Sequence, residues 1–183
     1  LTYTFCAMPL RALYVDFNSY FASAEQQLDP QLRGRPVGVL PVLAETTCCI
    51  AASHEAKRCG VKTGTLVAEA RKLCPDIRFV EARPAVYVDL HHRLVEAIES
   101  CLHVERVMSI DEVACRLAGS DRERRRARAL ADRIKRAIAE RVGTELSSSI
   151  GIAPNIFLAK VASDMQKPDG CVIIEDSDLP ECL

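Results

Sequence analysis

Residues 13–18 read Leu-Tyr-Val-Asp-Phe-Asn, an apolar run that ends on an acid. The same pattern returns at residues 107–113, Val-Met-Ser-Ile-Asp-Glu-Val, with two acids. A carboxylate at the end of a buried strand is exposed where the sheet meets solvent, and three converging carboxylates repel one another unless divalent cations lie between them. The pattern therefore predicts that Asp16, Asp111 and Glu112 form a metal site, in a layout suited to two Mg²⁺ ions that hold a triphosphate.

The elements around these runs predict an α+β protein with a ferredoxin-like sheet. When residues 18–82 are set aside, the remainder follows the order β-α-β-β-α-β, in which two helices cover one face of a four-stranded antiparallel sheet. The first and third strands are central neighbours in that order, and a hairpin joins the second to the third, so Asp16 and the Asp111-Glu112 pair come to the same end. The strands are expected at residues 10–15, 104–110, 113–117 and 147–152, and the helices at residues 84–101 and 122–142.

Residues 18–82 predict a small α/β insertion that hangs over this end of the sheet, where it could close on a substrate. A dense charge run at residues 121–128 keeps an apolar stripe and is interpreted as a solvated helix face. The insertion is expected to hold helices at residues 19–28, 53–59 and 65–73 and strands at residues 37–40, 48–52 and 77–80, and a helix at 155–163 and a turn at 167–170 follow the last strand.

Composition places the chain among globular proteins. Its 183 residues are 49% apolar and 27% charged, and no apolar run approaches the ~20 residues of a membrane span, so a cytoplasmic protein without membrane contact is expected. Nine cysteines, an odd number without a C-x-x-C pair, are interpreted as reduced core residues. The net charge of −1 counts mildly against a lone nucleic-acid-binding surface.

Four motifs carry a resemblance to a known family. In the same order and at similar spacing, from residue 10 to about 175, they resemble the Y-family translesion DNA polymerases of the DinB/UmuC type. The likeness covers the palm and fingers of that family. The motifs are Asp-Phe-Asn-Ser-Tyr-Phe-Ala at 16–22, His-Glu-Ala-Lys-Arg-Cys-Gly-Val-Lys at 54–62, Ser-Ile-Asp-Glu at 109–112, and Ser-Ile-Gly-Ile at 149–152 with its continuation through Lys160 to Asp-Met-Gln-Lys-Pro-Asp-Gly at 164–170.

The resemblance implies a fold, an activity and partners. Residues 1–17 and 83–167 would form the palm, 18–82 the fingers and 168–183 the start of a thumb, with the thumb and little finger absent from this chain. The implied activity is DNA-directed DNA synthesis during DNA repair and the SOS response, by a two-metal mechanism with two Mg²⁺ ions. The implied partners are primer-template DNA, deoxynucleoside triphosphates and a sliding clamp that binds through the absent C-terminal region.

The resemblance also implies roles for individual residues. Asp16, Asp111 and Glu112 match the catalytic, metal-binding carboxylates, with the Phe17 carbonyl as a backbone ligand. Phe21 matches the steric gate that crowds a ribose 2′-hydroxyl. The residues implied to bind the nucleotide are Asn18, Ser19, Tyr20, Phe21, His54, Lys57 and Lys160.

Four positions depart from the common family pattern. Asn18 stands where many members carry a second Asp, and Ala51 replaces a hydroxyl residue. His54 and Lys57 replace the usual Tyr and Arg. Because Lys is a point charge without the bidentate fork of Arg, a weaker grip on the triphosphate is expected.

Two other functions stay open at this point. A non-catalytic, polymerase-like accessory protein of DNA repair would use the fold for assembly, although a scaffold has no reason to keep three carboxylates beside the ring of Phe21. A nucleotidyl cyclase shares the palm-like topology and the two-metal chemistry, but offers no place for residues 18–82. His91 and His92, adjacent on a helix, face different sides and are expected to be surface residues.

Overall fold

A computed structural model describes residues 8–178 and contains a five-stranded sheet in the order β5-β6-β1-β7-β8. The first four strands are antiparallel to their neighbours, which confirms the ferredoxin-like order. The expectation of a four-stranded, purely antiparallel sheet is wrong, because β8 adds a fifth strand parallel to β7 within the segment assigned to a thumb. The strands are β1 (Ala12–Phe17), β5 (Val104–Val107), β6 (Glu112–Arg116), β7 (Ser148–Ala153) and β8 (Cys171–Ile173).

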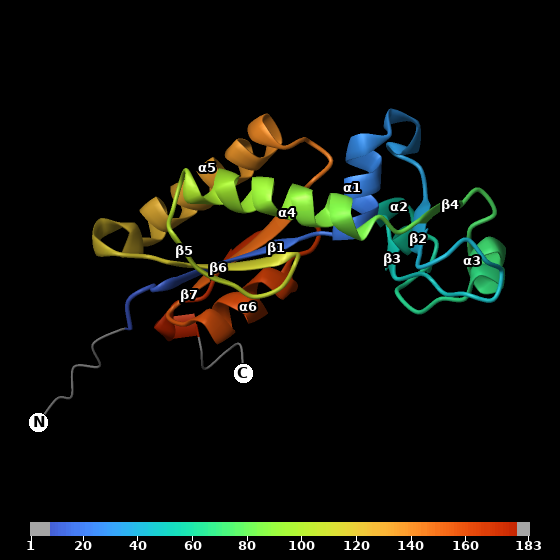
Figure 1. Cartoon of the computed structure of the whole chain (residues 1–183). Helices are drawn as coiled ribbons and strands as arrows, with labels where there is room; N and C mark the ends of the chain where they lie inside the picture. The colour runs from blue at the N-terminus through green and yellow to red at the C-terminus, as the bar shows by residue number, and fades with distance from the viewer. Residues whose placement is uncertain (1–7, 179–183) are drawn as a thin grey trace, which may run out of the picture.

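Helices cover both faces of this sheet (Figure 1). As expected, α4 (Pro84–Glu99) and α5 (Arg124–Arg141) lie together on one face. The third helix, α6 (Ile156–Met165), packs on the opposite face against β1 and β7. Strand β1 is buried over its whole length because alternate side chains enter the two cores. Leu13, Val15 and Phe17 face α4 and α5, whereas Ala12 and Tyr14 face α6.

A smaller three-stranded sheet, in the order β3-β2-β4, forms the other lobe of the molecule (Figure 1). Strands β2 and β4 are parallel, and β3 is antiparallel to β2. A separate apolar cluster that includes Leu40, Val61 and Val67 fills this lobe. Its elements are β2 (Val37–Leu40), β3 (Ala51–Ala52), β4 (Arg78–Glu81), α2 (His54–Arg58) and α3 (Val67–Leu73), and short 3₁₀ turns occur at Pro30–Leu32, Gly119–Arg122 and Asp176–Asp178.

Helix α1 (Tyr20–Leu28) joins the two lobes. The buried carboxylate of Glu25 accepts hydrogen bonds from both Nε and Nη2 of Arg83, at the start of α4, and from the Tyr87 hydroxyl at 2.8 Å. The Tyr20 hydroxyl donates to the Tyr87 carbonyl at 2.6 Å. These bonds hold α1, and with it the loop that follows β1, against the start of α4.

Helix α6 lies unusually close to β7 at Gly151. A Cβ atom there would come within 1.9 Å of the Ala159 carbonyl oxygen and 2.4 Å of the Ser163 nitrogen. Only glycine permits this approach, since real Cβ contacts are longer than about 3.0 Å. The position of α6 therefore depends on a residue without a side chain.

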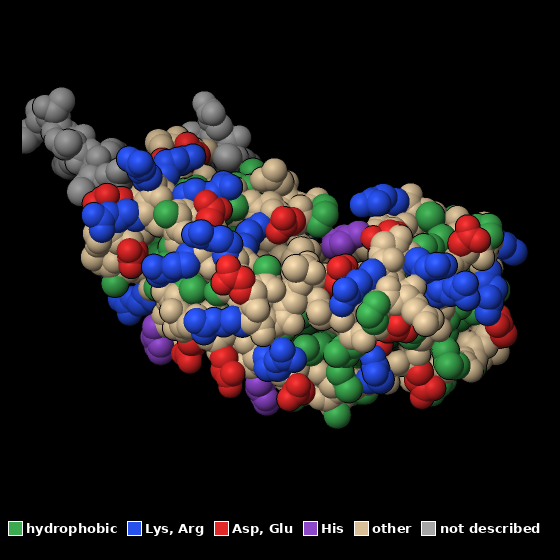
Figure 2. Space-filling view, turned by 90° about the horizontal axis from the view of Figure 1, so that it is seen from above, with side chains coloured by type: hydrophobic (Ala, Val, Ile, Leu, Met, Phe, Trp, Pro, Cys, Tyr) green, Lys and Arg blue, Asp and Glu red, His purple; other side chains and the backbone are tan. Residues whose placement is uncertain are grey.

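Two further expectations can be compared with the structure. The strand expected at 48–52 shrinks to Ala51–Ala52, because the Cys49 N–H donates to the Thr65 carbonyl instead of to a neighbouring strand. The charge run at 121–128 is a solvated face, as expected: Figure 2 shows Lys and Arg side chains mixed with Asp and Glu over the helical face of the larger lobe. Within the described residues, no helix is both long and apolar enough to cross a membrane.

Candidate active site

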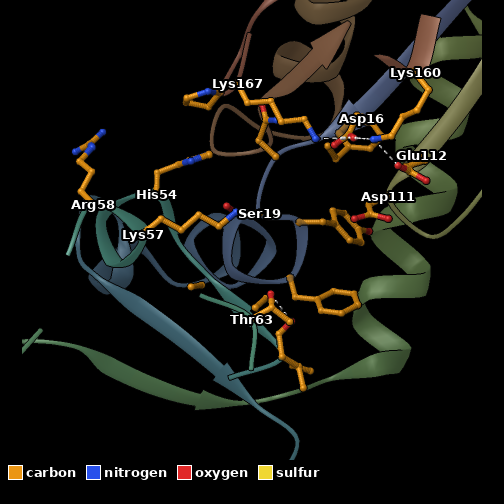
Figure 3. A pocket seen from close by; sticks show the side chains of 18 residues that line it. Asp16, Ser19, His54, Lys57, Arg58, Thr63, Asp111, Glu112, Lys160 and Lys167 are labelled. Carbon is orange, nitrogen blue, oxygen red and sulfur yellow. Dashed lines mark hydrogen bonds and ion pairs between the residues drawn. The ribbon is translucent and has the colours of Figure 1, made fainter. Parts of the chain in front are cut away.

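The sheet register brings the expected acids together. Asp16, on β1, pairs directly with Glu112 on β6 and with Ser149 on β7. Asp111 lies at the turn before β6, and its carbonyl accepts the Phe17 N–H at 2.9 Å. Figure 3 shows the three carboxylate side chains close to one another at the end of the sheet. The topology argument from the sequence therefore placed these acids correctly.

Ser109 orders two of the carboxylates. Its hydroxyl lies 2.7 Å from Asp111 Oδ1 and 3.3 Å from Glu112 Oε2. The Ser109 hydroxyl has one proton, so it donates to one acid at a time. Asp16 is only 5% exposed, and Asp111 and Glu112 are half-buried, so the acids lie where charge interactions are stronger than in water.

Two lysines reach the carboxylates, one from the middle of α6 and one from the turn after it. Lys160 Nζ lies 2.5 Å from Asp16 Oδ2, 2.8 Å from Glu112 Oε1 and 3.1 Å from Asp164 Oδ1. Lys167 Nζ lies 2.7 Å from Asp16 Oδ2 and 2.8 Å from Asp164 Oδ1. Lys160 was expected to contact a phosphate, and in this structure its ammonium group contacts the acids themselves.

These contacts change the ionisation of the groups. Burial opposes the charge of Glu112, but the hydrogen bond and the positive charge of Lys160 outweigh it and hold the Glu112 pKa below its usual value. For Lys160, burial again opposes the charge, and the bonds to Asp16 and Glu112 raise the pKa above its usual value. Both groups therefore remain ionised at neutral pH, as an ion-pair cluster.

A cavity of about 640 Å³ separates the acids from the smaller lobe. Asp16, Asp111 and Glu112 line one end, and α2 contributes cations to the opposite wall (Figure 3). A triphosphate that spans the cavity could meet the acid site at one end and positive charge at the other. The cations of this wall are Lys57 and Arg58, and His54 lies beside them.

Burial lowers the pKa of both His54 and Lys57, and the charge of a neighbouring lysine lowers each further: Lys57 lowers the pKa of His54, and Lys167 lowers that of Lys57. Each of these groups holds its proton less firmly than in water. An anion in the cavity would reverse that effect, so the wall favours a negatively charged ligand.

The start of α1 forms the floor of the cavity. Ser19 adopts a left-handed backbone conformation, with φ 51° and ψ 39°, and caps α1 without a side-chain hydrogen bond. Within the described residues, the buried Ser19 Oγ and His54 Nε2 have no hydrogen-bond partner. Both residues line the cavity, so a ligand bound there could supply the missing hydrogen-bond partners.

Asn18 has a different environment from its neighbours. Its N–H donates to the Ser147 carbonyl at 2.9 Å, its amide Nδ2 donates to Ser149 Oγ at 3.0 Å, and its Oδ1 accepts the Asp169 N–H at 2.8 Å. The amide thus links β1, β7 and the turn that carries Lys167. The N–H groups of the next three residues open the first turn of α1, where no intrahelical acceptor exists.

The two aromatic residues of the same segment, Tyr20 and Phe21, have different environments. The Tyr20 ring is buried and its hydroxyl is bonded, so only its backbone can reach a ligand. Phe21 lines the cavity, and its ring stacks on Tyr87 with centroids 4.7 Å apart and planes 18° apart. The ring of Phe21 is therefore held rigidly at the cavity wall.

Lys167, Asp164 and Arg58 belong to the site although the sequence did not place them among the metal-binding or nucleotide-binding residues. Their positions carried a signal: Asp164 follows Lys160 by four residues, so the two share a helix face, and Lys167 lies in one of the four motifs. Arg58 follows Lys57 directly. What the sequence could not reveal is that α6 places its charged face over the end of β1.

The acids fit a hard divalent cation. Their donor atoms are all oxygen, which suits Mg²⁺. Across residues 8–178, no group of three or more His, Cys, Asp and Glu side chains is arranged to hold a metal ion unaided. In this structure the Lys160 ammonium group lies between the carboxylates of Asp16 and Glu112.

Comparisons with known proteins agree on one family. The impB/mucB/samB family model matches residues 15–164. A "DNA polymerase IV" of Moorella thermoacetica is 39% identical over 170 residues, 92% of this chain and 42% of the relative. One of Xanthomonas campestris pv. campestris is 36% identical over 167 residues, 91% of this chain and 46% of the relative.

Solved structures give the same result. The "Crystal Structure of DinB from Sulfolobus solfataricus" and the "Insertion ternary complex of Dbh DNA polymerase" each have a TM-score of 0.83 and 28% identity, covering 93% of this chain and 50% of the other. The chain thus spans about half the length, or less, of the relatives it matches.

Proposed function

The chain belongs to the impB/mucB/samB family of Y-family polymerase regions, and on that premise we propose that it is the catalytic region of a DNA polymerase that acts in translesion synthesis. The reaction is template-directed nucleotidyl transfer: a primer 3′-hydroxyl attacks the α-phosphorus of a deoxynucleoside triphosphate, and pyrophosphate leaves. The observation that carries this proposal is one cavity with three carboxylates at one end and a cationic wall at the other.

Asp16, Asp111 and Glu112, with the Phe17 carbonyl, would hold two Mg²⁺ ions. Bound there, the ions would activate the primer hydroxyl and neutralise charge on the triphosphate. The protein contributes fixed geometry: the sheet register holds Asp16 opposite Glu112, and Ser109 orients Asp111. Such preorganised charge needs no rearrangement as the reaction proceeds.

The triphosphate would lie between the first turn of α1 and the cationic wall. The N–H groups of Ser19, Tyr20 and Phe21 belong to the first turn of α1, and a helix N-terminus favours the binding of an anion. The unpartnered Ser19 Oγ and His54 Nε2 gain acceptor or donor partners in that position. Lys57 and Lys160 supply positive charge, and the Phe21 ring stands where it would crowd a ribose 2′-hydroxyl.

The proposed domains follow the two sheets. Residues 1–17 and 83–167 form the palm and residues 18–82 the fingers, with β8 an addition to the palm sheet. Primer-template DNA and deoxynucleoside triphosphates are the proposed partners.

The test replaces Asp111 by Asn in a chimera with the C-terminal half of the Moorella thermoacetica DNA polymerase IV. Primer extension is expected to fall at least about a hundredfold, since one preorganised charge at a reacting centre contributes roughly 3 kcal/mol. Asp132→Asn, on the exposed face of α5, is the matched control and keeps the parent rate. Equal rates for Asp111→Asn and parent would contradict the proposal.

A further inference from the structure

We propose that Lys160 is a built-in competitor for the cation position between Asp16 and Glu112, so that divalent cations bind only by displacing its ammonium group. The inference rests on the proposed function, because it concerns the same acids. It adds a property that the acids alone do not have: an intrinsic limit on cation affinity, set by one residue of α6.

The contacts of Lys160 place its charge at the bridging position. Its Nζ lies within 2.8 Å of one oxygen from each of the two strands, Asp16 Oδ2 and Glu112 Oε1. A cation that bridges the same two carboxylates needs oxygen ligands at about 2.0–2.6 Å. The ammonium and the cation therefore cannot occupy this place together.

Burial makes the exchange costly in either direction. The Asp16 side chain is 8% exposed, and the Lys160 side chain is 31% exposed. Removing the ammonium without a replacement would leave Asp16 with Lys167 alone and, among the described residues, Glu112 without an ion-pair partner, which is unfavourable for carboxylates held in the protein. A divalent cation provides that replacement, so cation binding and lysine release are coupled.

The structure also contains a position to which the displaced lysine can move. Asp164, one helical turn further along α6, already lies 3.1 Å from Lys160 Nζ. The Tyr14 ring, on the same face of β1 as Asp16, has its centroid 5.6 Å from the same nitrogen. Lys160 can therefore leave Asp16 and Glu112 and keep a carboxylate and an aromatic face as partners.

Lys167 has a lesser part in this competition. It contacts Asp16 and Asp164 but reaches the carboxylates from the turn after α6 (Figure 3). Since Glu112 is bonded to Lys160 rather than to Lys167, only Lys160 spans both strands. The affinity limit is therefore assigned to Lys160.

The experiment measures Mn²⁺ binding to the 183-residue chain without DNA or nucleotide, by electron paramagnetic resonance of the free ion. Lys160→Met is expected to lower the Kd at least about tenfold, the factor carried by one charge-assisted hydrogen bond to a buried carboxylate. Lys57→Met is the matched control. It removes one positive charge from the same cavity, but Lys57 extends toward Ser19 (Figure 3), and a change below about threefold is expected from the weaker, unbonded interaction.

Lys160→Gln, which keeps a donor for Asp16 but no charge, is the second variant and is expected to behave like Lys160→Met. Thermal unfolding followed by circular dichroism is the control that tests whether each variant is folded. Equal shifts for Lys160→Met and Lys57→Met, or an unchanged Kd in both Lys160 variants, overturn the competition. Asp16→Asn distinguishes a failure of the proposed acid site from a failure of the Lys160 competition. If this variant binds Mn²⁺ as tightly as the parent, the acid site itself is wrong. If it binds Mn²⁺ more weakly, the acid site stands and the Lys160 variants decide the competition.

Discussion

Replacing Gly151 by Ala tests how closely the fold and the site are connected. The added Cβ would lie 1.9 Å from the Ala159 carbonyl oxygen, so β7 and α6 must separate by about 1.5 Å to reach an ordinary contact. The two nearest atoms, the Ala159 oxygen and the Ser163 nitrogen, belong to the backbone of α6, so no side-chain rotation can relieve the clash. Overpacking of this kind costs about 3 kcal/mol. For a chain of this size, that corresponds to a fall of about 6–12 °C in Tm.

The same displacement reaches the acids, because Lys160 follows Ala159 on α6. Its bonds of 2.5 and 2.8 Å to Asp16 and Glu112 would stretch beyond hydrogen-bond range. Calorimetry measures the Tm, and Ser148→Ala is the control in the same strand. The buried Ser148 Oγ has no hydrogen-bond partner among the described residues, so its removal should leave Tm nearly unchanged. A Gly151→Ala variant within about 2 °C of the parent would refute the close-packing argument.

Three further predictions concern the gate, the lobe connection and DNA. Phe21→Ala removes the proposed steric gate and should shift incorporation toward ribonucleotides in the chimera; an unchanged ratio would make Phe21 a residue that only packs on Tyr87. Glu25→Ala should lower stability by about 2–3 kcal/mol in urea unfolding, a value reduced because Arg83 is half exposed, and parent-like stability would contradict it. Residues 1–183 alone should bind primer-template about a hundredfold more weakly than the chimera at one salt concentration, and equal affinities would reveal an unrecognised DNA surface.

The sequence predicted the large sheet well because its order follows from local signals. Helix periodicity and the hairpin before β6 lead to the ferredoxin-like order, and that order brings Asp16 to Glu112. Strand β8 was missed because it has three residues and gains its partner, β7, only after α6 has crossed the sheet. A short strand whose pairing depends on the path of the preceding helix leaves no pattern in its own residues.

The face assignments of β1 were also hidden. A strand with one exposed face alternates apolar and polar residues, but β1 is covered on both sides and reads as a continuous apolar run. Nothing in residues 12–17 therefore indicates that Tyr14 and Asp16 share the face of α6. Without that face, the contact of Lys160 with the acids could not be inferred.

Asn18 shows why one departure from the family pattern is compatible with the site. An amide both donates and accepts, and Asn18 uses both abilities: Nδ2 donates to Ser149, and Oδ1 accepts the Asp169 N–H. Ser149 in turn donates to the Gln166 carbonyl at 3.2 Å. These bonds fix both ends of the turn at residues 166–169, which places Lys167 on Asp16. An ionised Asp has no donor and would add a buried negative charge beside Asp16. At this position the amide therefore acts on the acids indirectly, by holding the turn whose lysine pairs with them.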